Sequence, residues 1–312
     1  MNKVFTIGET VLDIIFRQEN PVAAKPGGSM LNTSVSLGRA GIPVRFISEF
    51  GHDPAGDLIT GFLDENGVST RHIHRYRDGQ TAIALAFLDE NQNASYSFYK
   101  SYPQERLMGS FPEVGKEDIL LFGSIYAITG EIREQLTRIA TQADESGAII
   151  IYDPNFRASH LPELEKVRPM IMENLSMASI VRGSDEDFLN IFASENGRDA
   201  YGKMKEAGKS SKEQWLVYTT SHAGVRVIGK NLDLEIPVPA ITPVSTIGAG
   251  DAFNAGMIFW LVKKKLTLDG LGSMKADEWE EMMKVAIRFA SNVCMSYENY
   301  ISANLLKEID LC

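Results

Sequence analysis

A glycine-rich run in front of a long apolar segment carries the residue types best suited to chemistry. Gly248, Ala249, Gly250 and Asp251 are followed by residues 252–262, which are mostly apolar. This order is typical of a tight loop that opens a buried helix. The N–H groups at a helix N-terminus are free to bind anions, and the helix dipole adds to the attraction. The run therefore predicts an anion site that suits a phosphate group, with Asp251 in the first turn beside it.

Asp251 itself has two interpretations. A carboxylate in the first turn of a helix often caps the free N–H groups. A carboxylate next to a bound phosphate can instead act as the base that accepts a proton from an acceptor hydroxyl. Both roles require the same residue type, so the spacing alone does not decide between them.

Two other nucleotide-binding patterns are weaker. Residues 224–230 match the letters of a phosphate-binding P-loop, but Asn231 stands where a Ser or Thr would reach magnesium. The interior of this run alternates like a strand, so we interpret it as part of a hairpin. No Gly-x-Gly-x-x-Gly follows the first predicted strand, which disfavours a Rossmann dehydrogenase.

The segments that must position the glycine loop alternate between two patterns. Short apolar or β-branched runs predict buried strands at 4–7, 44–48, 119–122, 148–152, 179–181 and 215–218. Helical patterns stand between several of these runs, at 30–40, 58–65, 132–143 and 167–175. This alternation predicts an α/β fold with a mainly parallel central sheet flanked by helices.

One stretch breaks the alternation. Residues 81–88 and 94–99 flank a turn-like segment and predict an antiparallel hairpin outside the main sheet. Residues 14–26 also lack helical periodicity, and the two pieces together predict a small β-sheet. No internal repeat or long linker divides the chain, so we expect one domain over residues 1–312.

Composition narrows the class of protein. The chain has 312 residues, 44% hydrophobic, and a net charge of −10, which offers no general basic field for nucleic acid or an anionic membrane. The apolar run 255–262 is far short of the roughly 20 residues of a membrane span. Cys294 and Cys312 cannot form a disulfide framework. These features, with an N-terminus unlike a signal peptide, predict a cytoplasmic protein.

A second glycine-rich motif near the N-terminus gives the glycine loop a partner. Residues 27–32 read Gly-Gly-Ser-Met-Leu-Asn, and with the run 248–251 they make the sequence resemble the ribokinase-like (PfkB) family of sugar kinases. Intermediate pieces agree with that resemblance, at residues 8–9, 153–157 and 180–187. The resemblance covers essentially the whole chain and favours the catalytic interpretation of Asp251. It implies a three-layer fold with a small β-sheet lid from about 10–27 and 76–100, through which such enzymes often form homodimers.

The resemblance also implies which residues bind the sugar. Asp13, Gly28 and Asn32 match positions that hydrogen-bond sugar hydroxyls, and Arg157 matches one near the sugar or the transferred phosphate. Each has a plainer alternative, because Asp13 could be a surface carboxylate, Asn32 an ordinary helix residue, and Arg157 the partner of a surface acid. Residues 248–250 match the family's anion hole.

For the nucleotide, the resemblance implies ATP with Mg²⁺. Thr219, Ser221 and Gly224 match the strand and loop that hold ATP, although Ser221 stands where glycine is usual. Asn292 matches a position close to the adenine. Asp187 matches the family's acid associated with magnesium, acting through water, although Ser184 replaces the asparagine of that element and a solvated acidic run is an alternative.

Two departures fall on one neighbouring cation site of the family. Ser245 stands where an aspartate often helps to bind a monovalent cation, and residues 298–301 read Glu-Asn-Tyr-Ile where a Gly-Ala element is usual. A serine carries no charge. We therefore expect activity to depend little on potassium.

The overall pattern is most similar to the fructokinase and 2-keto-3-deoxygluconate kinase branch, so fructose is the first expected substrate, with 2-keto-3-deoxygluconate and ribose as alternatives. A sugar phosphate would need a cationic clamp, for which Lys100 and Arg106 are candidates, although both suit surface positions better. The rival from another class is a catalytically weak sugar- or nucleotide-binding regulatory protein. Retention of Asp251 with both glycines argues against that rival.

Overall fold

A nine-stranded sheet forms the centre of the computed structural model, which describes residues 3–17, 19–88, 94–109, 111–210, 212–220 and 224–308. Within these ranges the strand order is β13-β12-β11-β10-β9-β8-β1-β4-β5. The strands are β1 (Val4–Ile7), β4 (Val44–Gly51), β5 (Val68–Tyr76), β8 (Ile119–Gly123), β9 (Ile149–Asp153), β10 (Ile180–Ser184), β11 (Trp215–Thr220), β12 (Gly224–Gly229) and β13 (Leu232–Ile236). Neighbours from β5 to β11 are parallel, and β12 and β13 are antiparallel at one edge.

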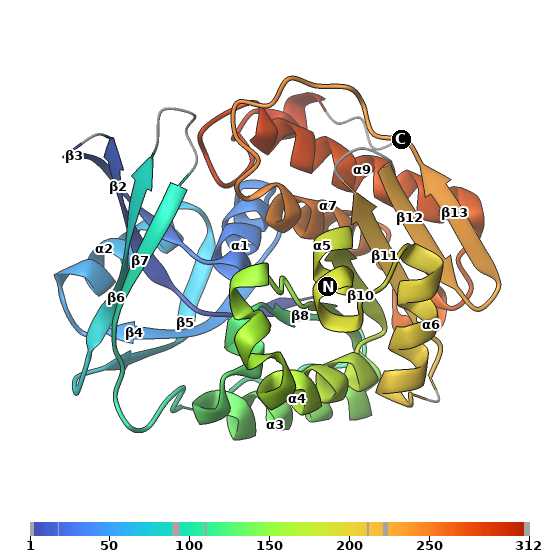
Figure 1. Ribbon diagram of the computed structural model, residues 1–312, viewed down its shortest axis with the longest axis horizontal. Helices are drawn as coiled ribbons and strands as arrows, with labels where there is room; N and C mark the ends of the chain where they lie inside the picture. The colour runs from blue at the N-terminus through green and yellow to red at the C-terminus, as the bar shows by residue number, and fades with distance from the viewer. Residues whose placement is uncertain are drawn as a thin grey trace.

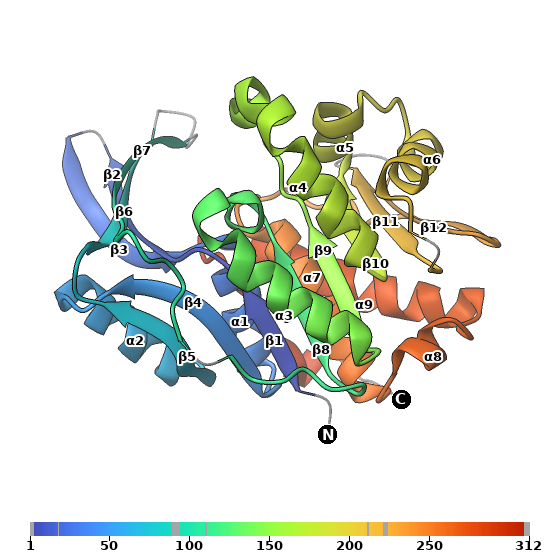
Figure 2. The ribbon, with the colours of Figure 1, turned by 90° about the horizontal axis from the view of Figure 1, so that it is seen from below.

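Helices cover both faces of this sheet and make three layers (Figure 2). One face carries α1 (Ser29–Arg39), α2 (Pro54–Glu65), α7 (Ala249–Lys263), α8 (Leu268–Leu271) and α9 (Ala276–Cys294). The other carries α3 (Arg133–Glu145), α4 (Leu164–Met177), α5 (Asp185–Phe192) and α6 (Gly197–Gly208). The described residues also form four short 3-10 helices: η1 (Ile125–Ile128), η2 (Gly130–Ile132), η3 (Ala158–Glu163) and η4 (Leu305–Glu308). The predicted α/β fold is confirmed.

A second, four-stranded sheet stands to the left of the main body in Figure 1. Its strands are β2 (Val11–Arg17), β3 (Asn20–Gly27), β6 (Gln80–Leu88) and β7 (Ala94–Ser101), in the order β3-β2-β6-β7. The antiparallel pairing of β6 with β7 confirms the predicted hairpin. Val22, Phe98 and Tyr99 of this sheet are more than half exposed, at 54%, 56% and 61%.

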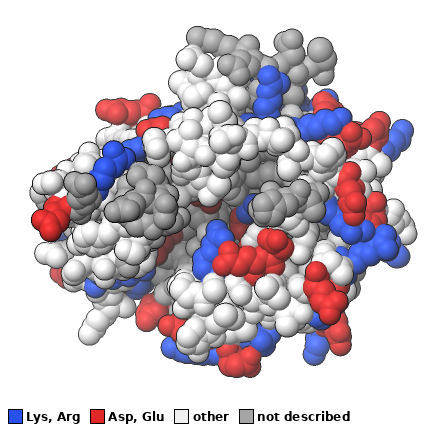
Figure 3. All heavy atoms as spheres, turned by 45° about the horizontal axis from the view of Figure 1, so that its top comes forward, with Lys and Arg blue, Asp and Glu red and all other residues white. Residues whose placement is uncertain are grey.

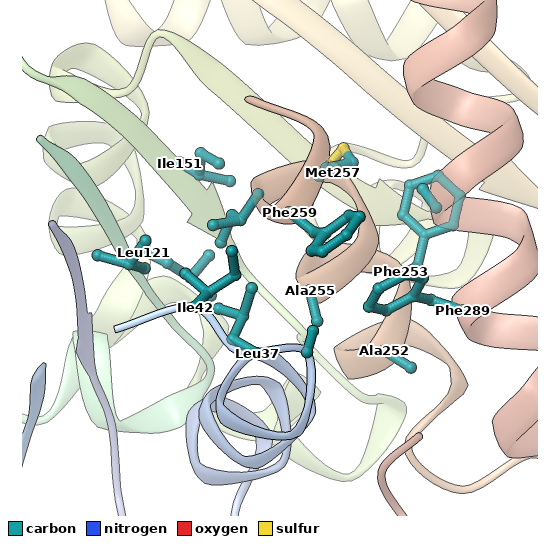
Figure 4. Packing of buried hydrophobic residues seen from close by; sticks show 14 of the residues in the cluster. Leu37, Ile42, Leu121, Ile151, Ala252, Phe253, Ala255, Met257, Phe259 and Phe289 are labelled. Carbon is teal, nitrogen blue, oxygen red and sulfur yellow. The ribbon is translucent and has the colours of Figure 1, made fainter. Parts of the chain in front are cut away.

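Helix α7 lies in the middle of the larger apolar core and is buried on nearly every face, as its sequence predicts. Its side chains lie among those of α1, the sheet and α9 (Figure 4). Gly256 lets α7 and α9 approach closely, because a Cβ there would lie 2.6 Å from the Cα of Ala286. Close packing of this kind fixes the direction of α7 and therefore the position of its N-terminus.

Two further expectations have a definite outcome. Residues 224–230 form β12 and the start of its turn, which confirms the hairpin interpretation over a P-loop. The surface position expected for Arg106 is wrong: it is 7% exposed, and its Nε lies 2.6 Å from Oε1 of the buried Glu49. A buried carboxylate needs such a partner.

The charged surface, the apolar length of the helices and the two cysteines are relevant to the expectations about membranes and disulfides. Acidic and basic side chains are interspersed over the face in Figure 3, which is hollowed near its middle. None of the helices in the described ranges is long and apolar enough to cross a membrane. Cys294 is a buried free thiol, and Cys312 lies outside the described residues.

Candidate active site

The N-termini of α1 and α7 meet at the carboxylate of Asp251. Ser29 Oγ donates to Asp251 Oδ1 over 2.5 Å, and Asn32 Nδ2 donates to Oδ2 over 2.8 Å. Thr33 Oγ1 donates to the backbone oxygen of Asp251 over 3.0 Å. Both carboxylate oxygens are therefore held by side chains from the first turn of another helix. The two glycine-rich motifs of the sequence lie together.

Gly28 sets the position of α1 at this junction. It precedes the helix with φ of 132°, and a Cβ there would lie 2.3 Å from the carbonyl oxygen of Glu9. Neither the backbone angle nor the space admits a side chain. The backbone therefore requires glycine at the place where α1 begins, and the predicted hydrogen bond from Gly28 to the sugar stays a prediction.

The glycine loop of α7 offers two free donors. Gly248 has φ of 80°, and a Cβ there would lie 2.4 Å from the carbonyl oxygen of Asn299. Ala249 N–H donates to Thr246 O over 3.2 Å, so it is already engaged. The N–H groups of Gly250 and Asp251 make no hydrogen bond within the described residues. Of the three N–H groups at 249–251, two are therefore available to an anion in this structure.

Burial is the main influence on the protonation of Asp251. The pKa of its carboxyl is raised from 3.8 to about 6, mainly by desolvation and to a smaller extent by the nearby Asp153 carboxylate. The hydrogen bonds from Ser29 and Asn32 and the positive charge of Arg182 lower the pKa. A buried carboxyl with a pKa near neutrality is suited to exchange a proton.

Asp13 and Asn32 present further acceptors beside this junction. The Asp13 carboxylate on β2 lies against Gly27, where a Cβ would meet Oδ2 at 2.1 Å. Burial raises the pKa of Asp13 to about 7, and its carboxylate makes no hydrogen bond within the described ranges. Asn32 Oδ1 is buried without a hydrogen-bond partner there. Acceptors without donors near α1 favour a ligand that brings hydroxyl groups.

The two cationic residues considered for a sugar-phosphate clamp are paired with acids. Glu9, which follows β1, accepts from Lys100 Nζ over 2.7 Å and from the Tyr102 hydroxyl. Arg106 is held by Glu49 and lies 3.5 Å from the centroid of the Tyr102 ring. The candidate clamp residues Lys100 and Arg106 thus each have a carboxylate partner.

Arg157 lies at the surface in an ion pair. Its Nη1 is 3.0 Å from Glu186 Oε2 of α5, and the two side chains are 55% and 46% exposed. This is the arrangement of the plainer alternative considered from the sequence. A role near the sugar stays a prediction.

Three of the four residues predicted to hold ATP lie on β11, β12 and α9. Thr219 Oγ1 accepts from Arg182 Nη2 over 3.2 Å and donates to Gly183 O over 3.3 Å. Gly224 starts β12 with φ of 100°. Asn292 Oδ1 accepts from Ser302 N over 2.8 Å. Ser221 lies outside the described residues.

Asp187 forms a capping box at the start of α5. Its Oδ2 accepts from the N–H and the hydroxyl of Ser184, each over 2.7 Å, and its Oδ1 accepts from Phe156 N over 2.5 Å. Burial and the neighbouring Asp153 raise the pKa of Asp187. Both oxygens are used by protein donors, and no group of three or more His, Cys, Asp or Glu side chains in the described part of the chain could hold a metal ion.

Several residues around the site were missed from the sequence. Asp153 Oδ2 accepts from Arg182 Nη1 over 3.1 Å and from Asn254 Nδ2 over 2.6 Å. Arg182 stands in a buried strand, and a charge there signals a partner on a neighbouring strand. Ser29 lies inside the N-terminal motif, so its hydroxyl was a visible candidate.

Comparisons with known proteins agree with this arrangement. The model of the pfkB family carbohydrate kinase matches residues 1–304. A fructokinase of Vibrio alginolyticus is 27% identical over 262 residues, covering 83% of each chain. An aminoimidazole riboside kinase of Salmonella typhimurium is 24% identical over 84% of this chain and 81% of its own. A fructokinase structure from Xylella fastidiosa with bound ATP superposes with a TM-score of 0.84 at 23% identity, covering 98% of each chain, which establishes the same fold.

Asp251→Asn should change stability in a pH-dependent way. The folded protein raises the carboxyl pKa from 3.8 to about 6, so the stabilisation from protonated Asp251 is present below about pH 4 and lost as pH rises through 6. Because asparagine does not titrate, the variant should gain about 3 kcal/mol relative to wild type between these pH values. Urea unfolding at several pH values measures the difference.

The control is Asp78→Asn, which changes an exposed aspartate. Its difference from wild type should vary much less over the same range. A difference between Asp251→Asn and wild type that stays constant from pH 4 to pH 7 would contradict the raised pKa.

Proposed function

Because this chain belongs to the PfkB family of carbohydrate kinases, we propose that it transfers the γ-phosphoryl group of ATP to a hydroxyl of a small sugar, with fructose as the substrate. The observation that carries the proposal is the Asp251 carboxylate at the N-terminus of α7. It is held by Ser29 and Asn32 of α1 and stands next to the free N–H of Gly250. The candidate base and the N–H donors for a phosphate group therefore lie next to each other.

The reaction is an in-line displacement at the γ-phosphorus. Asp251 accepts the proton of the sugar hydroxyl, the hydroxyl oxygen bonds to phosphorus, and the bond from phosphorus to the β,γ-bridging oxygen breaks, so that ADP leaves. The N–H groups of Gly250 and Asp251 hold the phosphoryl oxygens. Such donors contribute about 10²–10³ each in rate, and a positioned base about 10²–10⁴.

Magnesium enters with ATP as part of the nucleotide substrate. Mg²⁺ keeps several waters and binds phosphate oxygens with few protein carboxylates, which suits a chain whose Asp187 oxygens already accept protein hydrogen bonds. Bound to the phosphate tail, the ion would neutralise charge there. Asp187 would act on it only through water.

The sugar lies between α1 and the four-stranded sheet in this proposal. Asp13 and Asn32 Oδ1 have acceptor capacity that sugar hydroxyls would fill. The sheet of β2, β3, β6 and β7 serves as the lid of one kinase domain over residues 1–312. Its exposed Val22, Phe98 and Tyr99 support the proposal that this sheet is the contact for a homodimer.

The charges near the sheet favour a neutral sugar. Lys100 is paired with Glu9, Arg106 with Glu49, and Arg157 with Glu186. These carboxylate partners weaken the attraction of the three cations for a sugar acid such as 2-keto-3-deoxygluconate or for a sugar phosphate. The fructokinase of V. alginolyticus adds support for fructose, while ribose and the riboside of the S. typhimurium relative are the alternatives.

Asp251→Asn tests the proposal together with a substrate panel. Coupled ADP release should be greatest with fructose among fructose, 2-keto-3-deoxygluconate, ribose and adenosine. Loss of the base should lower turnover at least about a hundredfold while the protein stays folded. A folded Asp251→Asn protein with near-normal turnover would show that another group is the base. Sugar binding without turnover on any sugar would favour the regulatory rival.

Potassium should have little effect on turnover. Ser245 Oγ accepts from Ile247 N over 3.2 Å and is uncharged. On the nearby segment, Lys25 Nζ of β3 lies 3.2 Å from Glu298 Oε1 and donates to Tyr297 O over 3.4 Å, so a protein cation already occupies this segment. Turnover in potassium and tetramethylammonium buffers should agree. A large stimulation by potassium would contradict this expectation.

A further inference from the structure

Arg182 is anchored at the carboxyl end of the central sheet by both neighbouring strands. It stands on β10 and is 9% exposed. Its Nη1 lies 3.1 Å from Asp153 Oδ2 of β9, and its Nη2 donates to Thr219 Oγ1 of β11 over 3.2 Å. The guanidinium group is thus held in place before any ligand binds.

The guanidinium group of Arg182 stands against the glycine loop. A Cβ at Gly250 would lie 2.8 Å from Nη1 and 3.2 Å from Nη2. Its Cζ lies 5.4 Å from the centroid of the Phe253 ring, on the first turns of α7. Gly250 therefore leaves room for Arg182 immediately before Asp251.

The N-terminus of α7 opposes the placement of Arg182, although the ion pair with Asp153 offsets this. The N-terminus of a helix carries partial positive charge and repels a cation. Here a guanidinium group and the free N–H groups of Gly250 and Asp251 meet at one place. An anion between them would turn the repulsion into two attractions.

Not all N–H donors of Arg182 are engaged by the protein. A guanidinium group has five N–H donors, and Nε of Arg182 is buried with no hydrogen-bond partner in the described part of the chain. Asp153 does not depend on Arg182 alone, because Asn254 Nδ2 donates to the same Oδ2 over 2.6 Å. The ion pair with Asp153 therefore accounts for Nη1 of Arg182 but not for the close approach of the guanidinium group to Gly250.

The charges around the glycine loop also support an anion-binding role for Arg182. Asp251 and Asp187 both interact electrostatically with Asp153, which disfavours their charged forms, and with Arg182, which favours them. A phosphate tail beside three carboxylates is repelled unless cations contact it. Mg²⁺ would bind the tail, and Arg182 is placed to add a second positive charge at the glycine loop.

We propose that Arg182 is a catalytic residue that binds the transferred phosphoryl group. The inference rests on the proposed function and deepens it. As the sugar oxygen bonds to phosphorus and the bridging oxygen leaves with ADP, N–H groups of Arg182 donate to the non-bridging oxygens while Asp251 takes the hydroxyl proton. The planar fork of arginine suits two oxygens of one phosphate.

The test compares nucleotides that differ in the γ-phosphate. Arg182→Gln should lose affinity for the magnesium complex of AMP-PNP, a non-transferable ATP analogue, by at least about tenfold more than for that of ADP, measured by calorimetry. Its turnover should fall about 10²–10³-fold, with a smaller change in KM for the sugar. Arg182→Lys, which keeps the charge, should recover part of both losses.

Arg133→Gln is the matched control. Arg133 is largely buried, with its side chain 14% exposed, and pairs with Glu173 and Asn174 away from the glycine loop. Removing it should lower stability and leave the ratio of AMP-PNP to ADP affinity unchanged. If Arg182→Gln does not fold, Arg182→Lys decides, since a single ammonium group cannot reproduce the planar fork and should still weaken AMP-PNP binding selectively.

Equal weakening of both nucleotides in the folded Arg182 variant, or turnover like wild type, would overturn the proposal. A wild-type protein that binds both nucleotides but phosphorylates no sugar would overturn the proposed function alone. The comparison of AMP-PNP with ADP would then still decide whether Arg182 contacts the γ-phosphate.

Discussion

The contact between α1 and the Asp251 carboxylate is the interaction on which the site depends. Ser29 and Asn32 hold the two carboxylate oxygens over 2.5 and 2.8 Å, so α1 and α7 must each begin at a fixed place. Gly28 provides that start for α1 and Gly248 for α7, in both cases because a neighbouring carbonyl oxygen leaves no space for a Cβ. The buried flanks of α7 then keep the two helix ends from drifting apart.

Opposing effects set the properties of that carboxylate. Burial disfavours its charge more than two hydrogen bonds and Arg182 favour it, so its pKa lies at about 6 instead of 3.8. Without the hydrogen bonds the carboxyl would be protonated more readily; without burial it would be a weaker base for a proton in transit. The protein gives up some stability to keep this group inside, as is usual at functional sites.

The sequence made the elements and the two motifs predictable, because strands and helices follow from periodicity and the glycines mark where backbones approach. The buried surroundings of α7 were visible in its uniformly apolar residues. Side-chain partners across the sheet were harder to foresee. Nothing local identifies the particular partners, which are Asp153 for Arg182, Glu49 for Arg106 and Glu186 for Arg157, since each pair joins segments distant in the chain.

The pH dependence of kcat/KM for the sugar, in wild type and in Ser29→Ala, tests the central claim most directly. If Asp251 is the base, the rate falls below pH about 6. The hydrogen bond from Ser29 lowers the pKa of Asp251. Its loss in Ser29→Ala therefore raises that pKa and moves the fall in rate to higher pH. ATP and Asp13 titrate in both proteins, so their titration does not account for a difference between wild type and Ser29→Ala. A fall at the same pH in both would contradict the assignment of Asp251 as the base.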